Sequence, residues 1–533
     1  MSEPAASPAA PSSSALAPLA LPVFRMLWTA WLMANVCMWM NEVASAWMMT
    51  TLTTSPVMVA LVQTASTLPM FLLGLPSGAL ADILDRRRYL MSTQLWIAAI
   101  ALVLAAVVMT GAMSAPLLLA LTFANGIGLA MRWPTFAAIV PELVPRAQLP
   151  AALALNGVSM NASRIIGPVV AGALIAGAGA VWVFVLNALL SFAAAFAVWR
   201  WRRERRPSAL PGERFVGAMR VGIQYVRLSQ RMRAVVVRIF LFFLQSSALL
   251  ALLPLVARRL PGGDAGTYTL MLASMGAGAV AVGIFLPRVR ADVSRDALVV
   301  WGSVVQALAM TLVALVDHLA LVLPAMVVAG AAWLAVANSL TLSAQVALPD
   351  WVRARGMAIY QMSLMGGSAV GAALWGQVAG FAGVPVALLA AAASGAGLLP
   401  WTARLKLETG PDEDLAPVRP WQAPTASASL EPEAGPILVT IEYRIDPARA
   451  GEFRAVMQES RAARLRLGAV SWELFHDVTD PGRFIEYFVD ESWVEHLRRF
   501  ERFSAADVSL RERRIAFHIG PQPPRVTRYV SQS

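Results

Sequence analysis

Long apolar segments separated by short polar loops recur along the chain from Phe24 to Trp401. A helix needs about twenty mainly apolar residues to cross the hydrocarbon core of a bilayer. The segments that reach this length predict an all-α polytopic membrane protein with twelve transmembrane helices in two six-helix halves. Their expected ranges are 24–50, 57–83, 89–111, 116–140, 149–177 and 180–200, and then 234–257, 266–287, 296–316, 319–346, 355–381 and 384–401.

A basic and polar region, residues 202–233, separates the two groups of helices. Within it, apolar residues recur at helical spacing at Phe215, Met219, Ile223 and Val226. This pattern predicts an amphipathic helix that lies along the inner face of the membrane. A plain solvated linker would also fit the composition.

The pattern changes abruptly after Trp401. A polar linker rich in proline and alanine leads to Pro436, where alternating apolar residues begin. We expect strands at 437–443, 469–476, 483–489 and 515–519, with a helix from Pro447 to about Arg466 and another over 492–503. This β-α-β-β-α-β order predicts a small C-terminal α+β ferredoxin-like domain.

These patterns divide the chain into six parts. We expect a disordered N-terminal tail (residues 1–21), an N-terminal six-helix half (22–201) and a cytoplasmic central loop with its amphipathic helix (202–233). A C-terminal six-helix half (234–404), a linker (405–435) and a soluble ferredoxin-like domain (436–533) follow.

Composition supports a chain whose solvent is largely lipid. Hydrophobic residues make up 58% of the chain, charged residues only 14%, and the mean hydropathy is +0.61. The net charge of +11 does not indicate nucleic acid as a partner, because the basic residues stand in short loops between apolar segments. The single cysteine, Cys37, excludes an intrachain disulfide.

Arginines predict the orientation, since Lys406 is the only lysine. They gather in alternate loops, whereas the loops between hold only Arg258 and Arg259 as basic residues. The positive-inside rule assigns the arginine-rich loops to the cytoplasm. Both termini are then expected in the cytoplasm.

A loop motif lies between the second and third apolar segments. Gly78 and Asp82 stand near the end of one segment. Asp85, Arg86, Arg87 and Arg88 follow and complete the motif. The small residues Gly74 and Gly78 would let two helices approach closely. The motif resembles the loop between helices 2 and 3 of the major facilitator superfamily, although Ile83 and Asp85 depart from its pattern.

Two further stretches, 141–172 and 345–353, resemble a branch of this superfamily that includes the bacterial enterobactin exporter. The resemblance implies an exporter of the inner membrane that works by alternating access and is driven by protons. The expected substrate is an amphipathic small molecule, such as a siderophore or a drug-like compound. Many members carry an arginine where this chain has Thr122, so that arginine cannot couple protons here.

Three ionisable residues, Glu42, Arg132 and Arg164, lie inside expected membrane helices of the first half. Burying such a group in lipid costs on the order of 3 kcal/mol, so it tends to face a cavity or a partner. With the polar Asn161, these residues are candidates for a proton and substrate pathway. A structural Glu–Arg pair that joins helices would also explain them.

The fifth helix carries Gly167 and Pro168, followed by Gly172. The stretch resembles a Gly-Pro motif of exporting members, and proline frees backbone hydrogen bonds, so a hinge is expected. Close helix packing at the glycines would fit equally well.

The C-terminal domain resembles the dimeric α/β-barrel domains related to antibiotic-biosynthesis monooxygenases, which implies a homodimer through this domain. Trp472 and His496 are weak candidates for catalysis. The sequence contains no metal-ligand cluster in this domain and no phosphate-binding loop for ATP, so we expect no cofactor and no metal. A secondary transporter is therefore the main hypothesis, and a transporter-tethered enzyme or sensor is the alternative.

Overall fold

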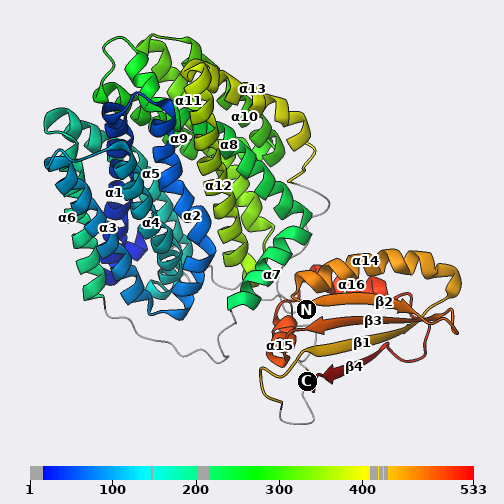
Figure 1. Ribbon diagram of the computed structural model, residues 1–533. Helices are drawn as coiled ribbons and strands as arrows, with labels where there is room; N and C mark the ends of the chain where they lie inside the picture. Colours follow the sequence, from blue (N-terminus) through cyan, green and yellow to red (C-terminus); the bar gives the residue numbers. More distant parts are fainter. Residues whose placement is uncertain are drawn as a thin grey trace, which may run out of the picture. The chain divides into compact units, whose positions relative to one another are not determined.

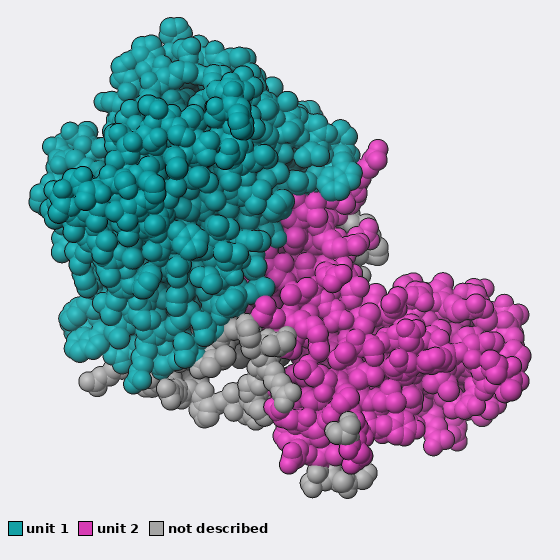
Figure 2. Space-filling view, in the orientation of Figure 1, with its two compact units in different colours: residues 1–208, 238–339, 361–403 teal, residues 209–237, 340–360, 404–533 magenta. Residues whose placement is uncertain are grey.

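The computed structural model describes residues 16–145, 148–201, 215–407, 418, 424 and 430–532. The chain forms two compact units, which Figure 2 distinguishes by colour. Unit 1 comprises Met1–Ser208, Arg238–Ser339 and Gln361–Ala403, and unit 2 comprises Ala209–Val237, Leu340–Tyr360 and Arg404–Ser533.

Two groups of long helices form the membrane part (Figure 1). The first group is α1 (Pro22–Leu52), α2 (Pro56–Ile83), α3 (Arg86–Met109), α4 (Ala115–Leu143), α5 (Leu149–Gly177) and α6 (Ala180–Arg200). The second is α8 (Gln230–Arg259), α9 (Ala265–Asp292), α10 (Arg295–Leu315), α11 (Leu319–Val346), α12 (Asp350–Ala382) and α13 (Val384–Thr402). Proline in the first turn of α1, α2, α4, α5 and α13 sets the backbone where those helices begin.

Eleven of these helices are long and apolar enough to cross a membrane. The remaining one, α1, has 31 residues, and its tryptophans, asparagines and Glu42 lower its hydropathy. The predicted fold class, an all-α membrane bundle with a small C-terminal sheet domain, is therefore confirmed.

Helix pairs within each half form the bundle, with α2 against α4, α3 against α6, and α1 against α5 and α6. In the second half α10 packs on α13, and α5 and α9 join the two halves. We refer to the end of the bundle where α1 ends and α2 begins as the arginine-poor end. The opposite end, where α2 ends and α3 begins, is the arginine-rich end.

A short helix, α7 (Phe215–Leu228), stands where the amphipathic pattern predicted one. In unit 2 its Tyr225 hydroxyl donates to the Ala347 carbonyl oxygen over 3.1 Å. The Gln224 amide donates to the Ala469 carbonyl oxygen over 3.1 Å. Within unit 2, α7 therefore contacts both the segment between α11 and α12 and the C-terminal domain.

The C-terminal domain contains β1 (Ile437–Arg444), α14 (Ala450–Arg466), β2 (Ser471–His476), β3 (Arg483–Asp490), α15 (Trp493–Glu501), α16 (Ala505–Ile515) and β4 (Arg525–Val530). Its antiparallel sheet has the order β2-β3-β1-β4, as in a ferredoxin-like fold. Figure 1 shows the helices on one face of this sheet.

The prediction of a last strand at 515–519 is wrong. Residues up to Ile515 belong to α16, which begins with a capping box between Ser504 and Asp507. The last strand lies later, at Arg525–Val530, and pairs with β1. α16 overlaps the expected strand only at Ile515, and the rest of 515–519 contributes a single β-bridge between His518 and Ile445.

One carboxylate organises the core of this domain. Glu486 on β3 is fully buried and receives hydrogen bonds of 3.0 Å from Tyr443, Arg464 and Trp472. Arg514 lies 3.6 Å from the same carboxylate. Burial alone would raise the pKa of Glu486, but the two arginines and the hydrogen bonds lower it to about 2.

We predict that Glu486→Gln destabilises the C-terminal domain by about 3–5 kcal/mol, because Arg464 and Arg514 would lose their buried counter-charge. Hydrogen exchange of the β1 and β3 amides in the full-length protein measures this loss. Glu452→Gln is the control, because that carboxylate forms an exposed ion pair with Arg449. Equal protection of the strands in both variants would contradict the prediction.

The same carboxylate predicts a pH dependence. Its pKa is about 2 in the folded protein and 4.5 as the reference value. A lowered folded-state pKa contributes stability that is fully present above about pH 4.5 and is lost as the pH falls towards 2. We expect amide protection in the wild-type domain to fall across this range, and the Glu486→Gln variant to lack this part of the pH dependence.

Candidate functional site

Charged and aromatic side chains from three helices meet inside unit 1. Trp39 and Glu42 are three residues apart on α1 and so occupy one face of that helix. The Arg164 guanidinium on α5 lies 5.4 Å from the Trp39 ring centroid and 4.3 Å from the Trp333 ring centroid. Glu42 lies within electrostatic range of Arg164 and near the Gln63 side chain of α2, whose amide donates to the Ser368 hydroxyl over 3.5 Å. We call Trp39, Glu42, Gln63, Arg164 and Trp333 the central cluster.

The central cluster draws on both halves of the bundle. Trp39, Glu42 and Arg164 belong to the first half, whereas Trp333 belongs to α11 of the second. A small cavity of about 30 Å³ adjoins the cluster and is lined by residues of both halves, including Arg164, Pro168, Gly330 and Trp333. A movement of one half against the other would therefore change the surroundings of Arg164.

Arg164 retains hydrogen-bonding capacity at this position. Its Nε and Nη1 atoms are buried and have no hydrogen-bond partner among the described residues. The two indole rings attract the cation through their π faces but accept no directed hydrogen bond from it. A guanidinium in this state can donate hydrogen bonds to an anionic or carbonyl group of a ligand.

The two halves contact each other closely towards the arginine-poor end. A Cβ atom on Gly172 of α5 would lie 2.2 Å from the Thr269 hydroxyl oxygen of α9. A Cβ atom on Gly376 of α12 would lie 2.5 Å from the Ala60 methyl group of α2. Trp47 also stacks on Tyr268, with 6.0 Å between ring centroids. Small residues thus allow the halves to meet at this end.

Towards the arginine-rich end, one face of α5 is open. Gly157 has no atom within 4 Å of the position where a Cβ would stand. One turn later the exposed Asn161 amide donates to the Gly157 carbonyl oxygen over 2.9 Å. Arg164 follows three residues further on the same face. Gly157, Asn161 and Arg164 therefore follow one another along one face of α5.

Arg132 does not lie in the central cluster, although the sequence groups it with Glu42 and Arg164 as a pathway candidate. It is 1% exposed and donates from Nη1 to the Ala34 carbonyl oxygen and from Nη2 to Asn35, over 3.1 and 3.2 Å. The guanidinium also lies 5.1 Å from the Trp31 ring centroid. Arg132 therefore joins α4 to α1 within the first half.

The loop motif has a structural basis in capping. The Asp85 side chain accepts a 3.0 Å hydrogen bond from the Arg88 backbone amide and caps α3. Arg87 donates to the Val198 and Trp199 carbonyl oxygens at the end of α6. Arg88 is exposed, Arg86 is half-buried, and the Asp82 side chain lies outside the described part of the structure.

The two glycines before this loop differ. A Cβ atom on Gly74 would lie 3.1 Å from Met362, so this position allows close packing, whereas Gly78 has no neighbour within 4 Å. The expectation of close helix approach therefore holds for Gly74 and not for Gly78.

The glycines of α5 take part in helix packing. A Cβ atom on Gly167 would lie 2.4 Å from the Trp39 Cβ atom, in addition to the contact of Gly172 with α9. Pro168 is buried and lines the cavity beside Arg164. These contacts supply the packing explanation for the glycines, and the hinge stays a prediction.

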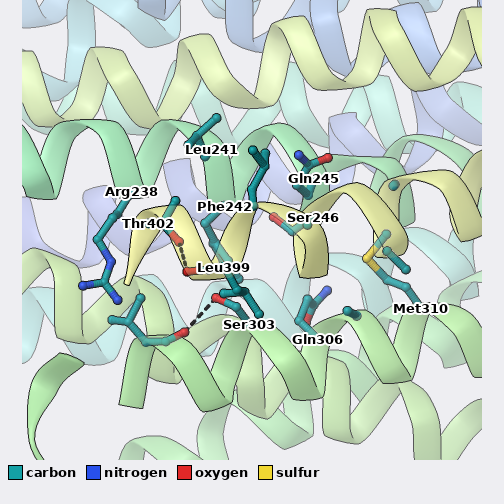
Figure 3. Close-up of a pocket in the computed structure, with 16 residues that line it drawn as sticks. Arg238, Leu241, Phe242, Gln245, Ser246, Ser303, Gln306, Met310, Leu399 and Thr402 are labelled. Carbon is teal, nitrogen blue, oxygen red and sulfur yellow. Dashed lines mark hydrogen bonds between the residues drawn. The ribbon is translucent and has the colours of Figure 1, made fainter. Parts of the chain in front are cut away.

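A second polar cavity of about 50 Å³ lies inside the second half, between α8, α10 and α13 (Figure 3). Gln245 accepts a 3.0 Å hydrogen bond from Ser394 there. The amide nitrogen and oxygen of Gln306 are buried without a partner among the described residues. Because helices of one half line this cavity, it is a weaker transport candidate than the central cluster.

The two candidates in the C-terminal domain belong to buried networks. Trp472 donates to Glu486. His496 is 2% exposed, its Nδ1 atom lies 2.8 Å from Asp490, and its Nε2 atom accepts from Arg528 over 3.0 Å. Burial lowers the pKa of His496, which leaves a neutral ring with Nδ1–H donating to Asp490. Among the described residues no group of three histidine, cysteine or acidic side chains could hold a metal ion.

Sequence reasoning did not find Trp333. It stands in the apolar stretch of α11, and no spacing connects it to Arg164 some 170 residues earlier. The contact with Arg164 is visible only once the two halves are assembled.

Comparisons with known proteins agree with the fold of a membrane transporter. The family described as "Transmembrane secretion effector" matches residues 13–533. The Staphyloferrin A transporter of Staphylococcus aureus (strain NCTC 8325 / PS 47) is 24% identical over 257 residues, which cover 47% of this chain. The match spans 63% of that relative, less than two thirds of its length.

Solved transporters share the fold at low sequence identity. The nucleoside transporter NupG has a TM-score of 0.55 at 12% identity, over 72% of this chain and 98% of NupG. The human organic anion transporter MFSD10 has a TM-score of 0.53 at 16% identity, over 72% and 99% of the two chains. The E. coli fucose:proton symporter FucP has a TM-score of 0.52 at 16% identity, over 72% and 98%. The chain therefore belongs to the transmembrane secretion effector family of major facilitator transporters.

Proposed function

We propose that the protein is a proton-driven exporter of an amphipathic small molecule, such as a siderophore or a drug-like compound. The observation that carries the proposal is Arg164, which lies beside Glu42 and between Trp39 and Trp333 of opposite halves. A charged pair in the membrane core is costly unless it has a function or a tight structural role. Its place between the halves is where alternating access would act on it.

The proposed orientation follows from arginine. Arginine-rich loops are cytoplasmic under the positive-inside rule, so both termini face the cytoplasm. The resemblance to bacterial exporters supports the inner membrane as the location. The close contacts of Gly172 and Gly376 then lie on the outer side. The open space beside Gly157 and the Asn161 amide then lie towards the cytoplasmic end of α5, which supports loading of the substrate from that side.

The Glu42–Arg164 pair suggests how protons would drive export. An antiporter requires that the proton and the substrate weaken each other's binding. A substrate with a hydrogen-bond donor for the Glu42 carboxylate and an acceptor group for Arg164 would replace the pair. Protonation of Glu42 from the outer side would remove the first contact and favour release. Substrate affinity is therefore expected to fall as the pH falls.

The chemistry around the pair favours an amphipathic substrate. Trp39 and Trp333 offer flat apolar faces, and Arg164 offers buried donors between them. The Staphyloferrin A transporter, by its name, carries a siderophore, which supports that substrate class here.

A second candidate function is a transporter-tethered enzyme, or a sensor, in the C-terminal domain. The ferredoxin-like order of its strands supports the resemblance to dimeric monooxygenase-like domains and hence a homodimer. The engagement of both nitrogens of His496 by Asp490 and Arg528 argues against a free general base at this position. We therefore assign transport to the membrane helices as the main activity.

We predict that Glu42→Gln reduces proton-gradient-dependent flux at least tenfold, because the side chain loses its exchangeable charge. Uptake of ethidium, Hoechst 33342 and desferrioxamine B into inverted membrane vesicles, acidified inside, measures the flux. Asp317→Asn is the matched control, because Asp317 forms a partly exposed pair with Arg259. Flux that survives Glu42→Gln would remove Glu42 from the coupling step.

We predict that Arg164→Lys raises the KM for substrate about tenfold while folded protein is retained. Lysine keeps the charge but lacks the planar group that fits between two rings and donates at fixed angles. Arg132→Lys should instead lower the yield of folded protein, because Arg132 satisfies groups of α1 within one half. Transport kinetics and size-exclusion profiles of both variants separate the two effects, and a similar loss of folded protein in both would contradict this assignment.

A further inference from the structure

The C-terminal domain contains the largest cavity that we describe in this protein. It has a volume of about 300 Å³ and lies between the sheet and the helices α14, α15 and α16. Its apolar wall includes Val439, Ile441, Phe488, Phe500 and Leu510. The wall is large enough, and apolar enough, to bury one or two rings of an organic molecule.

The same cavity carries an excess of positive charge. Five arginines line it, on α14, α15, α16 and β4: Arg464, Arg499, Arg511, Arg514 and Arg528. Three carboxylates lie close to these arginines. Asp507 lines the cavity, Glu486 pairs with Arg464, and Asp490 pairs with Arg499. Asp507 is already engaged in the capping box of α16. The wall is therefore net cationic as well as apolar.

Two of these arginines keep buried donors for a ligand. Arg499 is 2% exposed and pairs through Nη2 with Asp490, but its Nε and Nη1 atoms have no partner among the described residues. The Nε atom of the buried Arg514 also has no partner there. Buried donors without acceptors are costly, and an anion in the cavity would satisfy them.

Mutual repulsion also favours an anion. Burial, followed by the charge of Arg514, lowers the pKa of Arg511. Burial lowers the pKa of Arg499 to about 10. The charge of Asp490 opposes this shift, whereas Arg464 and Arg502 act in the same direction as burial. A bound negative charge would relieve this repulsion in a site partly shielded from water.

We propose that this cavity is a binding site for an amphipathic organic anion, of the class of aromatic carboxylates. The anionic group would accept from Arg499, Arg511 and Arg514, and the apolar part would lie against Phe488 and Phe500. The site is separate from the central cluster and does not depend on the transport function.

The cavity wall continues into contacts with other parts of unit 2. Leu467 lines the cavity, and its carbonyl oxygen accepts a 3.0 Å hydrogen bond from Arg502. The Arg502 guanidinium lies 5.1 Å from the Trp351 ring centroid, at the start of α12. The next residue, Gly468, is in contact range of Val221 on α7. A bound anion would thus lie against Leu467, whose chain neighbour Gly468 contacts α7.

The test is equilibrium binding of naphthalene-2-carboxylate to the full-length protein in nanodiscs, with empty nanodiscs subtracted. We expect saturable binding at one site per chain, and at least tenfold weaker binding of the neutral 2-naphthalenemethanol. Arg511→Gln should weaken carboxylate binding at least tenfold. Arg513→Gln is the matched control on α16, because its side chain pairs with the exposed Glu459 outside the cavity.

A third variant separates this site from the transport site. Arg164→Gln should leave carboxylate binding unchanged if the anion occupies the C-terminal domain. Arg511 is half-exposed, so its replacement avoids the folding risk of removing the buried Arg499. Absence of saturable binding, binding insensitive to Arg511→Gln, or binding lost with Arg164→Gln would each overturn the proposal.

Discussion

The cation of Arg164 inside the membrane is the constraint on which the bundle depends. A guanidinium in the hydrocarbon core needs compensation, and here it comes from Glu42 and from the rings of Trp39 and Trp333. Because Trp333 is the only one of these groups from the second half, the compensation joins the halves without a direct ion pair. That leaves Arg164 able to exchange an indole contact for a ligand.

Close backbone approach is the complementary constraint. Gly172 and Gly376 bring α5 to α9 and α2 to α12 at the arginine-poor end, whereas α5 is open at Gly157 towards the other end. Arg132 and its bonds to Ala34 and Asn35 keep α1 and α4 together as a body. The first half thus has an interior held by its own polar contacts, and its interface with the second half depends on small residues. Such an interface suits two bodies that rock against each other.

The sequence predicts the helices well because lipid imposes length and hydropathy on every segment. It predicts the first three strands of the C-terminal domain through alternation. It misplaces the last strand because β4 is mostly exposed and carries little apolar pattern. It identifies Glu42 and Arg164 as charges in apolar surroundings. It cannot separate Arg132 from them, since the direction in which a helix face points depends on packing between helices. The same limit hides Trp333.

The central claim is that the two halves rock against each other and so change the contact of Arg164 with Trp333, and a cysteine pair tests this movement most directly. A Cβ atom on Gly380 of α12 would lie 3.0 Å from Val57 Cγ2 of α2, which suits a disulfide between the halves at the arginine-poor end. The measurement is transport by Val57→Cys/Gly380→Cys in a Cys37→Ala background, before and after reduction. The account predicts transport that stops on oxidation and returns on reduction, with both single-cysteine variants unaffected. Full transport by the oxidised, crosslinked protein would contradict it.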